Sequence, residues 1–130
     1  MKKAVAGIIV FEDKILIVKK IIKEGHFLSG GWHIPGGHLH RNESEKNALL
    51  REIKEETNLD IQIIKKICRY EITENDVVVS WYLCSTKSGE TTPGDDLDQI
   101  DFVKRNDVIK KCDKRAVTLF PKKVIHYFST

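Results

Sequence analysis

The chain has 130 residues, of which 41% are hydrophobic and 32% charged, and its formal net charge is +3. This length predicts a single domain over residues 1–130, and the composition is typical of a folded domain with a buried core. The small positive excess is too weak to indicate a nucleic-acid-binding protein. No apolar run approaches the length of a membrane span.

The chain has three cysteines, Cys68, Cys84 and Cys112, which are far apart in the sequence. Their odd number and wide spacing argue against a disulfide framework or a zinc site and favour small buried apolar side chains. The N-terminal apolar run is ended by charged residues at positions 12–14, and no small-residue cleavage site follows. We therefore expect a cytoplasmic protein.

The first elements are predicted to be two strands. Residues 4–11 and 14–21 are apolar and rich in β-branched side chains, and the pair Glu12-Asp13 separates them. This pattern predicts a β-hairpin. A glycine-containing loop is expected over residues 22–31, and Pro35 keeps the residue before it extended.

A helix is predicted over residues 45–57 from its periodicity and its flanking breakers. Either Ser44 or Asn42 can cap its start, and Asn42 has the spacing of a capping box with Glu45. Asn58 stands where a left-handed residue would end the helix. The apolar side chains expected to face the core are Leu49, Leu50 and Ile53.

The second half of the chain contains further strands and helical segments. We expect two strands, over residues 61–72 and 77–86, and then an acidic loop over residues 88–98. A short strand over residues 100–103, a short helix over residues 108–112 and a helical tail over residues 116–128 should follow. In the tail, Pro121 is expected in the first turn of a second segment. The element order indicates an α/β (α+β) protein with a mixed sheet and helices packed against it.

Three carboxylates of the predicted helix share one face. Residues three and four apart are neighbours on a helix, so Glu52, Glu55 and Glu56 converge. Such carboxylates repel each other, and the C-terminal end of a helix favours cations. Arg51 offsets only part of this charge, and a Mg²⁺ ion, which prefers carboxylate oxygens, would offset the rest. For this segment alone, a solvated surface helix is an equally good interpretation.

The spacing upstream makes the pattern specific. Gly37 is followed by five residues, Glu43, seven residues and then the segment REIKEETNL. This arrangement resembles the Nudix box, the signature of the Nudix hydrolase family, with Asn58 where the family usually has Gly. The resemblance implies a Nudix-like mixed sheet between helices with a loop-helix-loop catalytic motif. It also implies hydrolysis of a nucleoside diphosphate linked to another moiety, with Mg²⁺ or Mn²⁺.

The resemblance also implies residue roles. The metal ligands would be Gly37 (through its carbonyl), Glu52, Glu55 and Glu56. Glu43 and Arg51 would form a structural pair that braces the loop on the helix. The general base is expected among Glu52, Glu55 and Asp96, the last in the acidic loop ahead of residues 100–103. For Asp95 and Asp98 in that loop, a solvated acidic turn is the favoured interpretation.

Residues that contact substrate are harder to predict. Lysines could attract phosphates and aromatic rings could stack on a base, which makes Lys19, Trp32 and Trp81 the chosen candidates. Further candidates of the same kinds are Lys20, Lys65, Lys66, Phe27, Tyr70 and Tyr82. The basic residues of the C-terminal segment are interpreted as a solvated helix face, and His38 and His40 as loop histidines.

The expected substrate is a small nucleotide. Residues 75–77 lack the Pro or Tyr that relatives preferring ADP-ribose or dinucleotides often carry, which favours a nucleoside triphosphate, with non-standard and oxidised ones included. The alternatives are an ADP-ribose or other nucleotide-sugar pyrophosphatase and a non-catalytic nucleotide-binding module. No dedicated nucleic-acid surface and no membrane contact are expected, and the protein would be a monomer or a homodimer.

Overall fold

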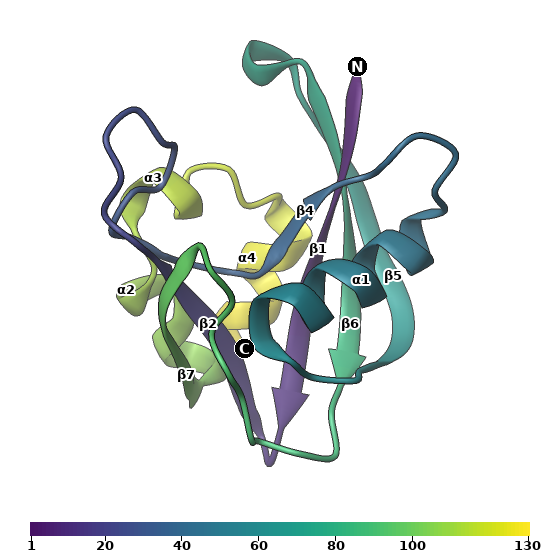
Figure 1. Cartoon of the computed structure of the whole chain (residues 1–130). Coiled ribbons are helices and arrows are strands. Elements are labelled where there is room, and N and C mark those ends of the chain that lie inside the picture. Colours follow the sequence, from purple (N-terminus) through teal and green to yellow (C-terminus); the bar gives the residue numbers. More distant parts are fainter.

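The hairpin at the start of the chain forms the middle of the sheet in the computed structural model, which describes residues 1–130 (Figure 1). Strands β1 (Lys2–Phe11) and β2 (Lys14–Lys20) are antiparallel. They are joined by Glu12 and Asp13, whose φ angles of 48° and 63° match a tight hairpin turn. The predicted hairpin is confirmed.

The two strands of the hairpin separate soon after the turn. They pair only at Val10 and Phe11 of β1, and β4 (Gly36–His38) pairs with β1 at Ala4 to Ala6 in place of β2. The glycine pair thus forms a short strand, which was not predicted. This strand brings Gly37 beside Val5.

The remaining strands complete a mixed sheet of order β3-β2-β1-β6-β5. Strand β6 (Val77–Ser85) runs parallel to β1, and the edge strand β5 (Gln62–Ile72) is antiparallel to β6. On the other side, β2 pairs with β3 (Trp32–His33) and with β7 (Leu97–Lys104). Because β7 begins at Leu97, the acidic loop is shorter than predicted.

Helices cover both faces of the sheet (Figure 1). Helix α1 (Glu45–Thr57) packs on one face through Ala48, Leu49 and Ile53. The other face is covered by three short helices, α2 (Val108–Lys111), α3 (Lys114–Val117) and α4 (Lys122–Ser129). Two 3-10 helices, Thr73–Asn75 and Arg105–Asp107, complete the elements. The expected mixed sheet between helices is confirmed, and no helix is long and apolar enough to cross a membrane.

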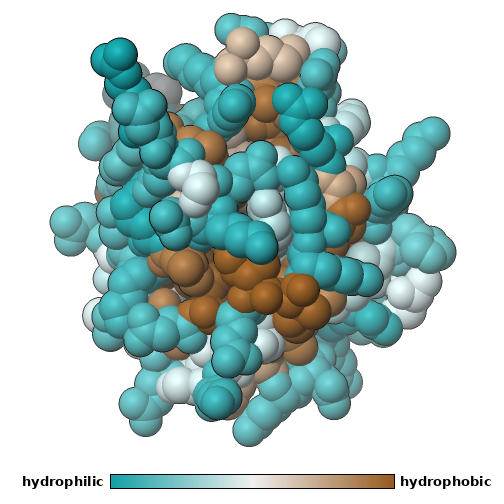
Figure 2. All heavy atoms as spheres, turned by 90° about the vertical axis from the view of Figure 1, so that its right-hand side faces the viewer, coloured by the Kyte–Doolittle hydropathy of each residue, from teal (hydrophilic) through white to brown (hydrophobic).

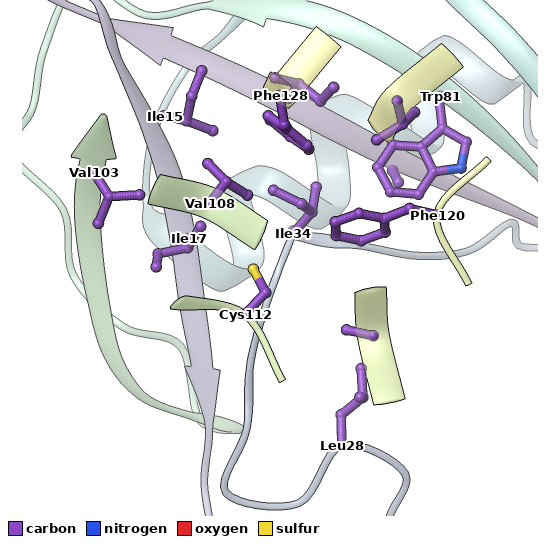
Figure 3. Packing of buried hydrophobic residues seen from close by; sticks show 14 residues of the cluster. Ile15, Ile17, Leu28, Ile34, Trp81, Val103, Val108, Cys112, Phe120 and Phe128 are labelled. Atoms are coloured by element: carbon purple, nitrogen blue, oxygen red, sulfur yellow. The ribbon is translucent and has the colours of Figure 1, made fainter. Parts of the chain in front are cut away.

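The strands supply two cores by alternation, since successive side chains point to opposite faces. In β1, Ala6 and Ile8 join the α2–α4 core, whereas Val5 and Ile9 join the α1 core. Figure 3 shows the first core, in which Trp81 and Phe120 pack edge to face at a centroid distance of 5.4 Å. Cys84 and Cys112 are buried as expected, and all the cysteines are free.

Several local predictions can be compared with α1 and the C-terminal segment. Ser44 is the N-cap, because its side chain accepts a hydrogen bond from the backbone N–H of Asn47 at 3.1 Å. Asn42 lies in a turn with φ 62°. Leu50 was wrongly expected to face the core, since it is 40% exposed, and Figure 2 shows apolar surface on the side that carries α1 and β5. Pro121 is the N-cap of α4, one position before the first turn.

Candidate active site

The carboxylates of α1 line a pocket of about 830 Å³. Its polar side combines one helix, one strand and one loop, and its lining residues there include Gly37, Glu52, Glu55, Glu56, Asp95 and Asp96. The spacing argument for one face of α1 therefore agrees with the geometry. The loop acid Asp96, 40 positions beyond Glu56 in the sequence, reaches the same pocket.

Arg51 joins the loop before α1 to the carboxylates of the helix. Its Nε and Nη2 donate to the two carboxylate oxygens of Glu43 at 2.8 and 2.9 Å, which is a bidentate ion pair. Its Nη1 donates to Glu52 at 2.9 Å, and Nη2 also donates to the carbonyl of His38 at 3.1 Å. The hydrogen bond from Arg51 lowers the pKa of Glu43 to about 2.

Glu56 lies deeper than the other two carboxylates. Burial, and then the charge of Glu52, raise the pKa of Glu56 to about 8, although the backbone N–H of Gly36 donates to Glu56 at 3.1 Å and opposes the shift. The raised pKa therefore reflects mainly the burial of the carboxyl group and, in addition, repulsion between neighbouring carboxylates. A cation bound between these groups would relieve it.

The glycine pair allows this close packing. A Cβ atom at Gly36 would collide with the backbone of Val5, and a Cβ at Gly37 would collide with the carboxyl group of Glu52. Both positions therefore need glycine. The carboxyl group of Glu52 consequently packs directly against Gly37.

Backbone hydrogen bonds attach the acidic loop to the end of α1. The N–H of Thr92 donates to the carbonyl of Thr57 at 3.0 Å, and the N–H of Gly94 donates to the carbonyl of Glu56 at 2.9 Å. These bonds satisfy carbonyls that have no partner inside the helix. On the far side of the loop, the N–H of Ile21 donates to the carbonyl of Asp96 at 3.1 Å, which fixes Asp96 beside the pocket.

The oxygen atoms of the pocket are of the kind that a hard divalent cation prefers, but they are not arranged around one. No group of three or more His, Cys, Asp or Glu side chains has the arrangement of a metal site. Arg51 occupies one oxygen of Glu52, and the side chain of Glu55 is 58% exposed. The composition of the pocket, with carboxylates, a nearby carbonyl and unbalanced negative charge, nevertheless fits Mg²⁺ or Mn²⁺.

The other side of the pocket is mainly apolar. Its lining includes Phe27, Leu28, Ile34 and Val79, together with Lys20. Phe27 is 55% exposed and can meet a ligand without rearrangement of the core. Phe27 and Lys20 were lesser candidates in the sequence, whereas Val79 could be found only once its strand was placed next to β1.

The chosen substrate-contact residues lie elsewhere. Trp81 is 5% exposed and packs against Phe120 in the core, so its selection as a stacking residue was wrong. Neither Lys19 nor Trp32 lines the pocket. The ammonium group of Lys19 lies 4.0 Å from Asp98, and Trp32 is half-buried against the α2–α4 core. The lysine that reaches the pocket is Lys20.

A further cluster holds the start of α1. Glu45 accepts hydrogen bonds from Tyr82 at 2.6 Å, Ser80 at 2.9 Å and Lys66 at 2.9 Å. Partial burial raises the pKa of Glu45, but these hydrogen bonds outweigh it and leave the pKa below its ordinary value. The cluster orients the helix on β6. It was missed because Glu45 resembles any first-turn acid.

The fold and pocket described above agree with one family of proteins. The NUDIX domain family model matches residues 1–128, and the chain belongs to this family.

Two relatives and one solved structure illustrate the similarity. An ADP-ribose pyrophosphatase of Methanocaldococcus jannaschii is 32% identical over 111 residues, which cover 82% of this chain and 64% of that protein. An 8-oxo-dGTP diphosphatase of Proteus vulgaris is 27% identical over 89 residues, covering 67% of this chain and 79% of that protein. The crystal structure of an ADP-ribose pyrophosphatase from Streptococcus suis superposes with a TM-score of 0.71 at 24% identity, covering 96% and 90% of the two chains.

Proposed function

We propose that this chain is a single Nudix domain that hydrolyses the diphosphate of a small nucleotide with the help of Mg²⁺ or Mn²⁺. The observation that carries the proposal is the pocket itself, in which three carboxylates of α1, the glycine strand β4 and the loop acid Asp96 come together. Membership of the NUDIX family supports it. A location in the cytoplasm is part of the same proposal.

The residues of the site would have separate roles. Glu52, Glu55, Glu56 and the carbonyl of Gly37 would hold the divalent cation. When bound, this cation would neutralise charge on the diphosphate oxygens and lower the pKa of a water molecule. Glu43 and Arg51 would keep the loop and the helix in register, since their ion pair spans both.

The hydrolysis itself needs a base. The oxygen of water forms a bond to phosphorus, the bridging P–O bond breaks, and the proton of the water passes to a carboxylate. Of the three candidates, Glu52 has one carboxylate oxygen held by a hydrogen bond from Arg51 at 2.9 Å, whereas the shortest contact of Arg51 with Glu55 is 3.3 Å. We therefore assign the proton transfer to Glu55 or Asp96.

The substrate class follows from the two sides of the pocket. Phe27 and Val79 offer an apolar surface for a base, and Lys20 offers a charge for phosphate. We propose a nucleoside triphosphate, giving a monophosphate and pyrophosphate. ADP-ribose is the second candidate, since the Methanocaldococcus relative is named as an ADP-ribose pyrophosphatase.

The test is a panel of nucleoside triphosphates, oxidised triphosphates and nucleotide sugars, with product masses measured with and without Mg²⁺. We expect release of phosphate or pyrophosphate that a chelator abolishes. The Glu56→Gln variant should lose about 100-fold or more in kcat, and Mg²⁺ should raise the thermal unfolding temperature of the wild type more than that of the variant.

The matched control is Glu74→Gln, which removes an exposed acid that does not line the pocket and should leave kcat unchanged. Full activity of Glu56→Gln would refute the mechanism. A wild-type protein that binds one nucleotide tightly but hydrolyses none would instead support the non-catalytic binding module.

A further inference from the structure

A second concave site lies between the edge of the sheet and the last helix. Its volume is about 590 Å³, and its walls come from β5, β6 and α4. It shares no lining residue with the catalytic pocket. We call it the basic groove, and its basic residues are Lys65, Lys66, Lys122, Lys123 and His126.

The fold brings these residues together from two distant segments. The pairs Lys65-Lys66 and Lys122-Lys123 are separated by more than 50 positions, and the sequence alone presents the second pair as part of a solvated helix face. The pKa of the Cys68 thiol is affected by lysines from both segments. Burial raises the pKa of Cys68, while Lys123 and Lys66, from the two different elements, both act to lower it.

The positive charge of the groove is poorly compensated. None of its lining residues has an acidic side chain, and only Lys66 has a side-chain carboxylate partner, Glu45, at 2.9 Å. Helix α4 adds to the imbalance, because its first turn carries two lysines and no acid, and Pro121 provides no side-chain cap. A helix start normally favours anions. Isolated surface lysines are usually just solvated, whereas these line one hollow.

The floor of the groove is apolar. Ile67, Leu83 and Tyr127 line it, and each is half-buried. The guanidinium of Arg105 lies over the Tyr127 ring at 5.0 Å from its centroid, which holds the ring in place. The groove therefore offers lysines for phosphate oxygens and an ordered aromatic and aliphatic surface for a flat ring.

We propose that the basic groove is a second binding site, for a nucleoside phosphate whose phosphate group meets the lysines and whose base lies against Tyr127. Leu83 of the groove and Val79 of the apolar side of the catalytic pocket lie four residues apart on β6 and point to the same face of the sheet, but the two sites have no lining residue in common. The buried pair Trp81 and Phe120 lies in the core of this face. Nucleotide bound in the groove is thus separate from nucleotide undergoing hydrolysis.

The test is calorimetric titration of the full chain with adenosine monophosphate in the presence of a chelator. Without metal, the acids of the catalytic pocket repel an anionic ligand, so the groove dominates binding. The triple variant K65Q/K122Q/K123Q should bind about tenfold or more weakly. The control K46Q/K104Q/K111Q removes the same charge from exposed lysines outside the groove and should change the dissociation constant by less than about twofold.

Two further measurements keep the proposal independent of the variants. Adenosine monophosphate should shift backbone amide resonances of β5 and α4 in the wild type, and the triple variant should keep its metal-dependent hydrolysis, which shows that it folds. Pyrophosphate should bind more weakly than adenosine monophosphate because it cannot use Tyr127. The proposal would be overturned by equal weakening of binding in both triple variants or by the absence of saturable binding. It would also be overturned if pyrophosphate bound as tightly as adenosine monophosphate, or if only a longer oligonucleotide bound.

Discussion

At the scale of single residues, Arg51 links the most parts of the site. It donates to Glu43, to Glu52 and to the carbonyl of His38, so one guanidinium joins the loop, the helix and the end of β4. The planar guanidinium group presents several N–H donors in fixed directions, which these contacts require. The ammonium group of lysine is a point charge and could not make all of them. The position therefore depends on geometry as well as on charge.

The Arg51→Lys variant should lower kcat/KM about 10- to 100-fold if Glu52 binds the metal as proposed, because Arg51 then orients a metal ligand. Glu43→Gln should have a similar effect, and the double variant should be little worse than either single one because the two residues act as a unit. Steady-state kinetics at several Mg²⁺ concentrations would measure this.

Arg41→Lys is the matched control, since Arg41 is exposed and makes no contact with the carboxylates of α1. It should behave as the wild type. Additive losses in the Arg51 and Glu43 double variant would show that the two residues act separately.

His33 gives a residue-scale prediction about pH. Its Nδ1 must donate to the carbonyl of Ile34 at 2.9 Å, and its Nε2 is buried without a partner. Burial lowers the pKa of His33 from 6.5 to about 4. The unfolded chain thus binds more protons than the folded one between these values, and stability falls as the pH drops from 6.5 to 4, by about 3 kcal/mol for this group.

The measurement is urea unfolding of the wild type and of His33→Asn between pH 4.5 and 7. The wild type should lose more stability than the variant as the pH falls, because asparagine does not titrate, while carboxylates contribute equally to both proteins. Parallel curves would contradict the assignment to His33.

At the scale of elements, α1 is the one that the sequence predicted best. Its bounds, its left-handed end at Asn58 and the shared face of its carboxylates were all visible in spacing and breakers. The exception is Leu50, where apolar periodicity is ambiguous by one position. Strand β4 was missed because two glycines have a low propensity for a strand. The glycines are needed because the backbone of Val5 and the carboxyl group of Glu52 leave no room for a Cβ atom.

The end of α1 allows an element-scale prediction. Asn58 has φ 65°, and its N–H donates to the carbonyl of Lys54 at 2.9 Å. Glycine adopts this conformation more readily. Asn58→Gly should therefore stabilise the protein by about 0.5–1 kcal/mol in urea unfolding without changing kcat, and Asn58→Ala should destabilise it by a similar amount.

Asn47→Gly provides the control for this prediction, because Asn47 lies inside the same helix. Glycine there should destabilise the protein by a few tenths of a kcal/mol or more. Stabilisation by glycine at both positions would indicate an effect unrelated to the left-handed end.

At the scale of the whole molecule, the sequence predicted the class of fold and the polar half of the pocket, but not its apolar side. The choice between Lys19 and Lys20 shows why. The pairing of β2 with β7 is irregular between these two residues, and an irregularity shifts the alternation of side chains in a way that sequence does not reveal. Trp81 was misplaced because burial depends on Phe120, nearly 40 positions away.

The bonds between the acidic loop and α1 have a consequence for chain entropy. Between Glu56 and Gly94 lie 37 residues, and closing so long a loop for two backbone hydrogen bonds would be costly for a flexible chain. The hairpin of β5 and β6 removes most of that cost, because its own pairing, from Gln62 with Ser85 onward, already brings the chain back. The segments left to order are residues 58–61 and 86–93, short enough for those bonds to hold Asp96 in the lining of the same pocket as the carboxylates of α1.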